Sequence, residues 1–312
     1  MPEPIQIPMK IKTGDPPVLE DVNQWLLLPR VLFAHIYHKL KEVWQRRFVR
    51  DAEQLQGFWD CQADNPQFQQ PDILSHRSSM RQRCIPLRMH SDGIVVTGRG
   101  RSWSKMLDVF SWGLVLGWGQ TDTMLNFRST DEELANLLRW SFTALWEGHW
   151  PKRDHTGNEF PIGSRAHDLP HGTDTFLAEG YYALLRTIES DLDVLAVFWN
   201  FPRVGSATPC AYCPSTNRLG PMPFDNFDVA PPAPWMPQIR SLEYMRDHLE
   251  IFPNPMYSIP GVTALTVCSD WMPTKYLGTD QYCLGSVLFT LCNHLMCGSP
   301  EEIVRRSGRR SR

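Results

Sequence analysis

The stretch from Cys84 to Gly117 most constrains how this chain can fold. It opens with an alternating apolar segment that ends at Asp92-Gly93, passes through a turn rich in Gly, Arg and Ser, and closes with the apolar run 107–116. Two such runs around turn residues predict a β-hairpin. Asp92 then lies on the first strand, either as a metal ligand or, because Asp-Gly is a common turn dipeptide, as the opening of a turn.

A second acid, Asp191, follows another apolar segment. Residues 181–188 form a strand or an apolar helix that ends at Asp191, where helical spacing resumes, so Asp191 is also suited to cap a helix. If the first and fourth strands of a sheet are neighbours, Asp92 and Asp191 come together. Paired carboxylates of this kind hold Mg²⁺ or Mn²⁺ for in-line phosphoryl displacement.

Composition shifts along the chain predict its domain organisation. The regions are a disordered, Pro-rich arm (1–20), an N-terminal helical region (21–83), a core with a Cys knuckle (84–213), a Pro-rich insertion (214–261), a C-terminal strand and helix that are a truncated core or a further insertion (262–304), and a basic tail (305–312).

In the helical region, Pro29 is suited to a first turn. One helix face is then predicted from residues at three- and four-residue spacing, namely Leu32, His35, Ile36, Leu40, Val43 and Trp44. The later turns are rich in basic residues, namely Lys39, Lys41, Arg46, Arg47 and Arg50. These cations either complement the helix dipole or form a face that contacts phosphates.

Cysteine spacing marks one candidate metal site. Of the eight cysteines, only Cys210 and Cys213 form a close pair, in a turn flanked by Pro209 and Pro214. Two thiolates at this spacing can bind one side of a tetrahedral Zn²⁺, which needs two further ligands. A redox thiol pair and two plain core cysteines are the alternatives.

Residues 149–174 also hold side chains that can bind metal: His149, Asp154, His155, His167, Asp168, His171 and Asp174. His167 and His171 have the spacing of one helical turn. Pro170 and the nearby glycines nevertheless favour a surface loop.

Charge and hydropathy exclude several protein classes. A net charge of −3 provides no general attraction to nucleic acid, so DNA binding would depend on local basic patches. The chain starts without a secretory signal, and no apolar run approaches the roughly 20 residues that span a bilayer, which predicts a soluble intracellular protein. The Arg-rich tail predicts nuclear import or a nucleic-acid tether, or is a plain overhang. Neither a Walker loop nor a GxSxG elbow is present.

The order of the motifs resembles a known family. The blocks are Arg88–Gly93, Lys105–Trp112, Ser190–Asp193, Pro209–Cys213, Ser269–Met272 and Leu277-Gly278. They resemble DDE transposases of the Kyakuja-Dileera-Zisupton (KDZ) and CACTA groups over residues 20–304. The resemblance implies an α/β, RNase H-like mixed sheet flanked by helices. It also implies Asp92 and Asp191 as the first and second catalytic acids, with Cys210 and Cys213 as the knuckle that follows.

Two departures from the family bear on activity. Pro273 stands where such elements commonly have His, and Glu301 and Glu302 are the only local candidates for the third acid. We therefore expect a transposon-derived protein whose metal-dependent DNA cleavage and strand transfer is weak or lost. DNA at transposon ends, no membrane, a homo-oligomer and a nuclear location are the corresponding expectations. The alternative is a non-catalytic, zinc-stabilised module for nucleic-acid binding or other interactions.

Overall fold

The computed structural model divides the chain into two units, residues 1–268 and 269–312. It describes residues 5–13, 18–49, 51–97, 105–116, 123–126, 131–173, 175–203, 205–226, 234–235, 238, 240–241, 254–270 and 286–287. The sheet, apart from the last residue of its final strand, and the helices around it belong to the first unit.

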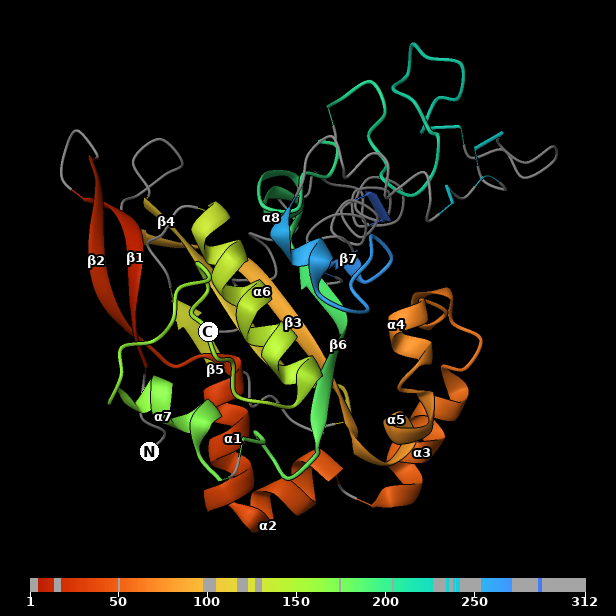
Figure 1. Cartoon of the computed structure of the whole chain (residues 1–312). Helices are drawn as coiled ribbons and strands as arrows, with labels where there is room; N and C mark the ends of the chain where they lie inside the picture. Colours follow the sequence, from red (N-terminus) through yellow and green to blue (C-terminus); the bar gives the residue numbers. More distant parts are fainter. Residues whose placement is uncertain are drawn as a thin grey trace, which may run out of the picture. The chain divides into compact units, whose positions relative to one another are not determined.

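A mixed β-sheet organises the first unit (Figure 1). Its strands are β3 (Cys84–Thr97), β4 (Lys105–Leu114), β5 (Thr123–Asn126), β6 (Tyr182–Ser190) and β7 (Val267–Ser269), in the order β5-β4-β3-β6-β7. The strands β3, β4 and β5 pair antiparallel, whereas β6 runs parallel to β3. The predicted mixed α/β class and the predicted hairpin are therefore confirmed.

The burial pattern of β3 explains its central place in the sheet. Residues 84–87 are all buried, and beyond them half-buried Arg88 and His90 alternate with buried Met89 and Ser91. Continuous burial is typical of a strand that is covered on both faces, and alternation marks a face with polar side chains. The polar part of β3 is thus the part that leads to Asp92.

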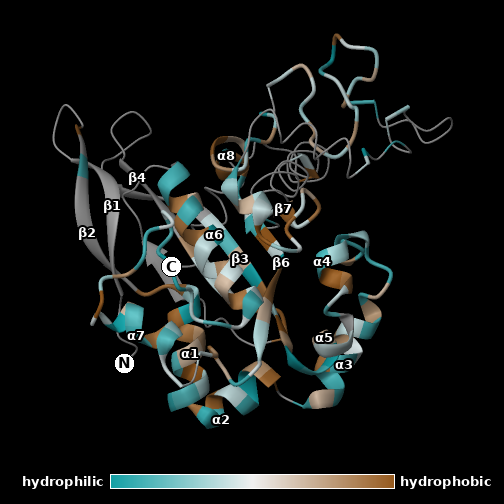
Figure 2. Cartoon of the chain, in the orientation of Figure 1, coloured by the Kyte–Doolittle hydropathy of each residue, from teal (hydrophilic) through white to brown (hydrophobic). Residues whose placement is uncertain are grey.

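Helix α6 (Asp131–Glu147) lies across the sheet (Figure 1). It carries both hydrophobic and hydrophilic residues (Figure 2), and its buried apolar side chains include Leu134, Leu137, Leu138, Phe142 and Leu145. This spacing is the amphipathic pattern of a helix that packs on a core. The ring of Trp146 contacts that of Tyr182 edge-on, with centroids 5.4 Å apart, and so joins α6 to the start of β6.

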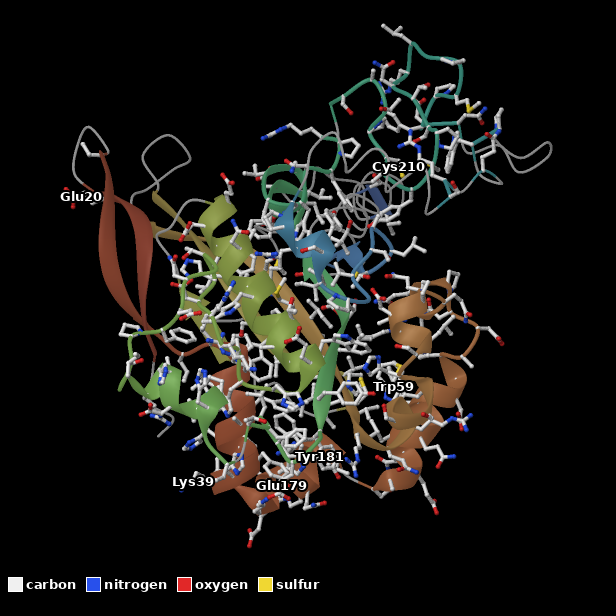
Figure 3. The ribbon with its side chains drawn as sticks, in the orientation of Figure 1. Glu20, Lys39, Trp59, Glu179, Tyr181 and Cys210 are labelled. Atoms are coloured by element: carbon white, nitrogen blue, oxygen red, sulfur yellow. The ribbon has the colours of Figure 1, made fainter. Side chains whose placement is uncertain are left out.

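The predicted helical region is present before the sheet. It consists of α1 (Pro29–Lys39), α2 (Lys41–Val43), η1 (Trp44–Val49), α3 (Ala52–Cys61), η2 (Pro66–Phe68), α4 (Pro71–Leu74) and α5 (Arg77–Arg83). Pro29 begins α1, as predicted. Trp59 (labelled in Figure 3) joins α3 to the sheet, because its indole N–H donates to the Cys84 carbonyl at 2.9 Å.

The buried face of α1 differs from the predicted one. Leu32 and Ile36 are partly buried against the core, as expected, but Phe33 and Tyr37 are more deeply buried, and Leu40 is exposed beyond the end of the helix. The Tyr37 hydroxyl donates to Glu179 at 2.7 Å, and Figure 3 shows Glu179 and Tyr181 together beside this part of the chain. The orientation of α1 therefore follows its partners in the loop before β6, which helical spacing alone does not reveal.

Two paired strands begin within residues 1–20, where we predicted a disordered arm. β1 (Ile5–Thr13) and β2 (Val18–Leu26) pair antiparallel with Ile5 opposite Leu26. Residues 5–12 alternate apolar and polar types except at Pro8, so the period of a strand is present in the sequence. The prediction gave proline content more weight than this alternation.

The predicted His-rich surface loop also contains a helix. α7 (Arg165–His171) occupies part of that segment. Ser164 caps α7 by accepting a bond from the His167 backbone N–H at 3.2 Å, and Pro170 is accommodated near its end. Short capped helices escape a prediction that relies on long periodic runs.

The remaining elements are short. α8 (Leu192–Val197) follows β6, and η3 (Pro255–Ser258) lies in the predicted Pro-rich insertion. Residues 214–226 of that insertion form turns with a bridge between Thr216 and Pro223. The predicted helix at 282–295 lies outside the described residues except for 286–287, which are helical, and the basic tail lies wholly outside them.

Candidate functional site

The parallel pairing of β3 and β6 brings the two predicted acids to neighbouring backbone positions. Ser91 lies opposite Ser190 in the register of the two strands. Adjacent strands lie about 4.8 Å apart. Because Asp92 follows Ser91 and Asp191 follows Ser190, each aspartate comes directly after the last position at which β3 and β6 pair. The adjacency of strands that a shared cation site requires is therefore present.

A buried polar contact joins the two strands just before the aspartates. Ser91 and Ser190 are fully buried, and their hydroxyls hydrogen-bond to each other. The indole N–H of Trp199, also fully buried, donates to the Ser190 hydroxyl at 3.2 Å. A buried hydroxyl without a partner costs about 1–3 kcal/mol, so this chain of bonds favours the observed register over a shifted one.

Asp191 caps α8, as the sequence predicted. Its Oδ1 accepts a bond from the Val194 backbone N–H at 2.6 Å, and its carbonyl accepts one from the Leu195 N–H at 2.9 Å. The carboxylate is half-buried and has a second oxygen that the cap does not use. The cap therefore orients the Asp191 carboxylate and uses only one of its two oxygens.

Asp92 lies within β3 and pairs with Val109 in the register with β4. Its side chain falls outside what the structure describes, as do Glu301 and Glu302. Among the described side chains, no three His, Cys, Asp or Glu residues are grouped so as to hold a metal ion. A cation bound by both aspartates stays a prediction.

The structure adds Glu189 and His90 to the candidate site. They lie opposite each other in the β3–β6 register, and both are half-buried. Paired residues in a parallel ladder share a face of the sheet, so an acid and an imidazole accompany the strand ends. The sequence does not single out Glu189, because its facing of His90 depends on a strand register that no local pattern contains.

Cys210 and Cys213 form the predicted turn and carry free thiols. The Tyr212 backbone N–H donates to the Cys210 sulfur at 3.3 Å, and the Arg240 guanidinium donates to the Cys210 carbonyl at 3.0 Å. The Cys213 thiol contacts the Ser215 hydroxyl at 3.4 Å. The turn is thus held by bonds within the segment and by one arginine from outside it.

The two thiols differ in acidity. Burial raises the pKa of Cys210. Burial also acts to raise the pKa of Cys213, but hydrogen bonds with Ser215 and with the Cys210 thiol, together with the charge of Arg240, outweigh it and lower that pKa below its usual value. A depressed thiol pKa favours the thiolate, which is the form that binds metal or reacts.

The histidines of residues 149–174 do not form one cluster among the described residues. His149 stacks near Phe176, His155 pairs with Glu133, and the rings of His167 and His171 stack 4.5 Å apart on α7. The spacing of His167 and His171 is helical after all, which corrects the predicted loop, and Asp174 lies outside the described residues.

The basic residues of the N-terminal region are exposed on α1, α2 and η1. Lys39, Lys41, Arg46 and Arg47 are all accessible, and Arg50 lies outside the described residues. The Lys41 ammonium lies over the Tyr37 ring, 3.6 Å from its centroid. Their exposure is compatible with both predicted roles, dipole complement and phosphate contact.

Comparisons of the chain with protein-family models, curated proteins and solved structures found no match. No helix within the described parts of the chain is both long and apolar enough to cross a membrane.

Proposed function

We propose that this chain is a transposase-derived protein with an RNase H-like core, formerly or weakly a metal-dependent DNA phosphodiester transferase. The observation that supports it is the pairing of Ser91 with Ser190, which sets Asp92 and Asp191 at neighbouring strand positions. The first strand of the core, β3, lies beside the fourth, β6, and β4, β5 and α6 lie between them in the sequence. This is the order of elements that the resemblance to DDE transposases requires.

The donor chemistry of this site fits a hard divalent cation. Asp191 offers a carboxylate oxygen that its cap leaves free, and Asp92 would supply the second carboxylate. A bound Mg²⁺ or Mn²⁺ would supply charge stabilisation at a phosphodiester. In this proposal Asp191 orients the site through α8, and the buried bonds of Ser190 keep the strand ends in register.

Weak or absent catalysis is part of the proposal. Two carboxylates bind a divalent cation less firmly than three, and the candidates for a third, Glu301 and Glu302, lie outside the described residues. DNA as the partner, a nuclear location and assembly into a homo-oligomer are expectations of the same proposal. Each needs its own measurement.

A melting experiment with Mn²⁺ tests the cation site. We expect Mn²⁺ to raise the melting temperature of the wild-type protein, and we expect Asp191→Asn and Asp92→Asn to abolish that rise. Asp193→Asn is the matched control, because Asp193 is an exposed acid in the first turn of the same helix. An equal Mn²⁺ effect in all four proteins would refute the site.

A second assay measures DNA cleavage. We expect the protein to leave supercoiled plasmid intact in the presence of Mn²⁺. Cleavage that disappears in Asp92→Ala would contradict the expected loss of activity while supporting the site itself.

The alternative function is a non-catalytic module stabilised by zinc. The free thiols of Cys210 and Cys213 on one turn favour it, because they provide half of a tetrahedral site. This alternative predicts one equivalent of zinc in the purified protein, its loss in the double variant Cys210→Ser/Cys213→Ser, and no melting response to Mn²⁺. Cys61→Ser, which alters an exposed free cysteine, is the control.

A further inference from the structure

A second candidate site lies on α6, apart from the strand ends. A cavity of about 470 Å³ opens between α6 and residues 151–157. Its lining includes Arg139, Trp140 and Thr143 from the helix and Lys152 and His155 from the loop. The Trp140 indole N–H donates to the Arg153 carbonyl at 2.9 Å and so fastens this loop to the helix.

Several buried nitrogens around this cavity have no hydrogen-bond partner within the described structure. They are Nε of Arg139, Nδ1 of His155, and Nε and Nη1 of Arg30. Arg30 is 1% exposed, and its guanidinium stacks 3.5 Å from the centroid of the Trp140 ring. Buried polar groups are normally paired, and Arg139 lines the cavity, so its unpaired cationic Nε points to an anion that completes it.

The charge of Arg30 persists at neutral pH. Burial lowers the pKa of Arg30 to about 9, which still leaves the guanidinium protonated near pH 7. Trp140 lines the cavity, and the buried Arg30 guanidinium stacks on its ring, so Arg30 adds a positive potential to this wall of the cavity. This potential favours an anion in the cavity even though Arg30 does not itself line it.

Glu133 fixes His155 in the wall of the cavity. Its Nε2 lies 2.8 Å from Glu133 Oε1, and its side chain is 1% exposed. The Nε2–H donates a hydrogen bond to the Glu133 carboxylate, and the Nδ1 atom on the other side of the ring has no hydrogen-bond partner.

The acids at the cavity are partly engaged elsewhere. Asp154 Oδ1 accepts bonds from the Thr156 hydroxyl at 2.7 Å and from the Asn158 N–H at 2.8 Å. Arg153 lies 3.8 Å from Glu159, and Glu147 is exposed. Of the basic lining residues, Arg139 and Lys152 therefore carry most of the attraction for an anion.

We propose that the α6 cavity binds a phosphate monoester, held by Arg139 and Lys152 beside the Trp140 ring. A guanidinium and an ammonium suit the terminal oxygens of such a group. The ligand is either a free nucleotide or the phosphorylated end of a polynucleotide, which share this chemistry. The proposal stands independently of the cation site at the strand ends.

Calorimetric titration of the full chain with three probes tests the proposal. The probes are adenosine monophosphate, an oligothymidylate with a 5′-phosphate, and the same oligothymidylate with a 5′-hydroxyl. We expect at least one phosphorylated probe to bind, and the hydroxyl probe to bind at least about tenfold more weakly, because it lacks a charge-assisted contact. Binding of the nucleotide alone would identify a free nucleotide, and binding of the phosphorylated oligomer would identify a polynucleotide end.

Variants locate the binding in the cavity. Lys152 is exposed, so Lys152→Gln should fold normally and weaken the phosphorylated probe about tenfold, and Arg139→Gln should weaken it further. Arg203→Gln removes one positive charge from an exposed position outside the cavity lining and should leave binding unchanged. No binding of either phosphorylated probe, equal binding of the hydroxyl probe, or equal losses in Arg203→Gln and Lys152→Gln would each overturn the proposal.

Discussion

Asp191 has two proposed roles, as a helix cap and as a cation ligand, and a pair of substitutions separates them. Asp191→Ala removes the bond that Oδ1 accepts from the Val194 N–H at 2.6 Å. Loss of an N-cap side chain of this kind costs about 1 kcal/mol. Asp191→Asn keeps an amide oxygen at the same place, so only the attraction between the carboxylate charge and the helix dipole is lost, about 0.3–1 kcal/mol.

Urea denaturation followed by tryptophan fluorescence measures these differences. We expect Asp191→Ala to lower the free energy of unfolding by about 1 kcal/mol, and Asp191→Asn to lower it by less. For a chain of this size the alanine variant should melt about 2 °C lower. Asp193→Ala is the control, because Asp193 is exposed and should change stability by no more than about 0.5 kcal/mol.

The reasoning fails if Asp191→Asn is as unstable as Asp191→Ala, since the cap would then contribute nothing beyond its charge. It also fails if Asp191→Ala is as stable as the wild type. When the two variants differ in stability but both lose the Mn²⁺ response, the cap and the cation site are distinct roles of one side chain.

Further predictions concern the strand contact, two glycines and the thiols. Ser190→Ala should lower the free energy of unfolding in urea by about 1–3 kcal/mol, because the buried indole that donates to it loses its acceptor; unchanged stability would show that the contact is dispensable. Gly261→Ala should destabilise the protein by about 1–3 kcal/mol, because φ is 81° there and the new Cβ would lie 2.8 Å from a leucine methyl. Gly57→Ala lies in open space on α3 and should stabilise the protein by about 0.5–1 kcal/mol. The check is that the two variants shift the melting temperature in opposite directions. Iodoacetamide should modify Cys213 before Cys210 as the pH rises, because the lowered pKa of Cys213 yields thiolate at lower pH, and peptide mass spectrometry that found the reverse order would contradict the assigned acidities.

Local sequence patterns determined much of the fold. Alternation marked the β3–β4 hairpin, three- and four-residue spacing after Pro29 marked α1, and an acid before renewed helical spacing marked the Asp191 cap. Each of these signals lies within a few residues, because strand and helix periods and caps are properties of neighbouring residues. The same signal was present for β1, where proline content led to the wrong interpretation.

Tertiary structure alone decided which residues meet. The hydrogen bond between Ser91 and Ser190 joins residues 99 positions apart, and the facing of Glu189 and His90 depends on the same register. Only packing of distant segments selects that register, since a slip by one residue would turn every side chain to the other face of the sheet. The stacking of Arg30 on Trp140 is a contact between α1 and α6 that no motif in either helix predicts. Whether a buried charge is tolerated depends on the groups packed around it, which come from distant parts of the chain.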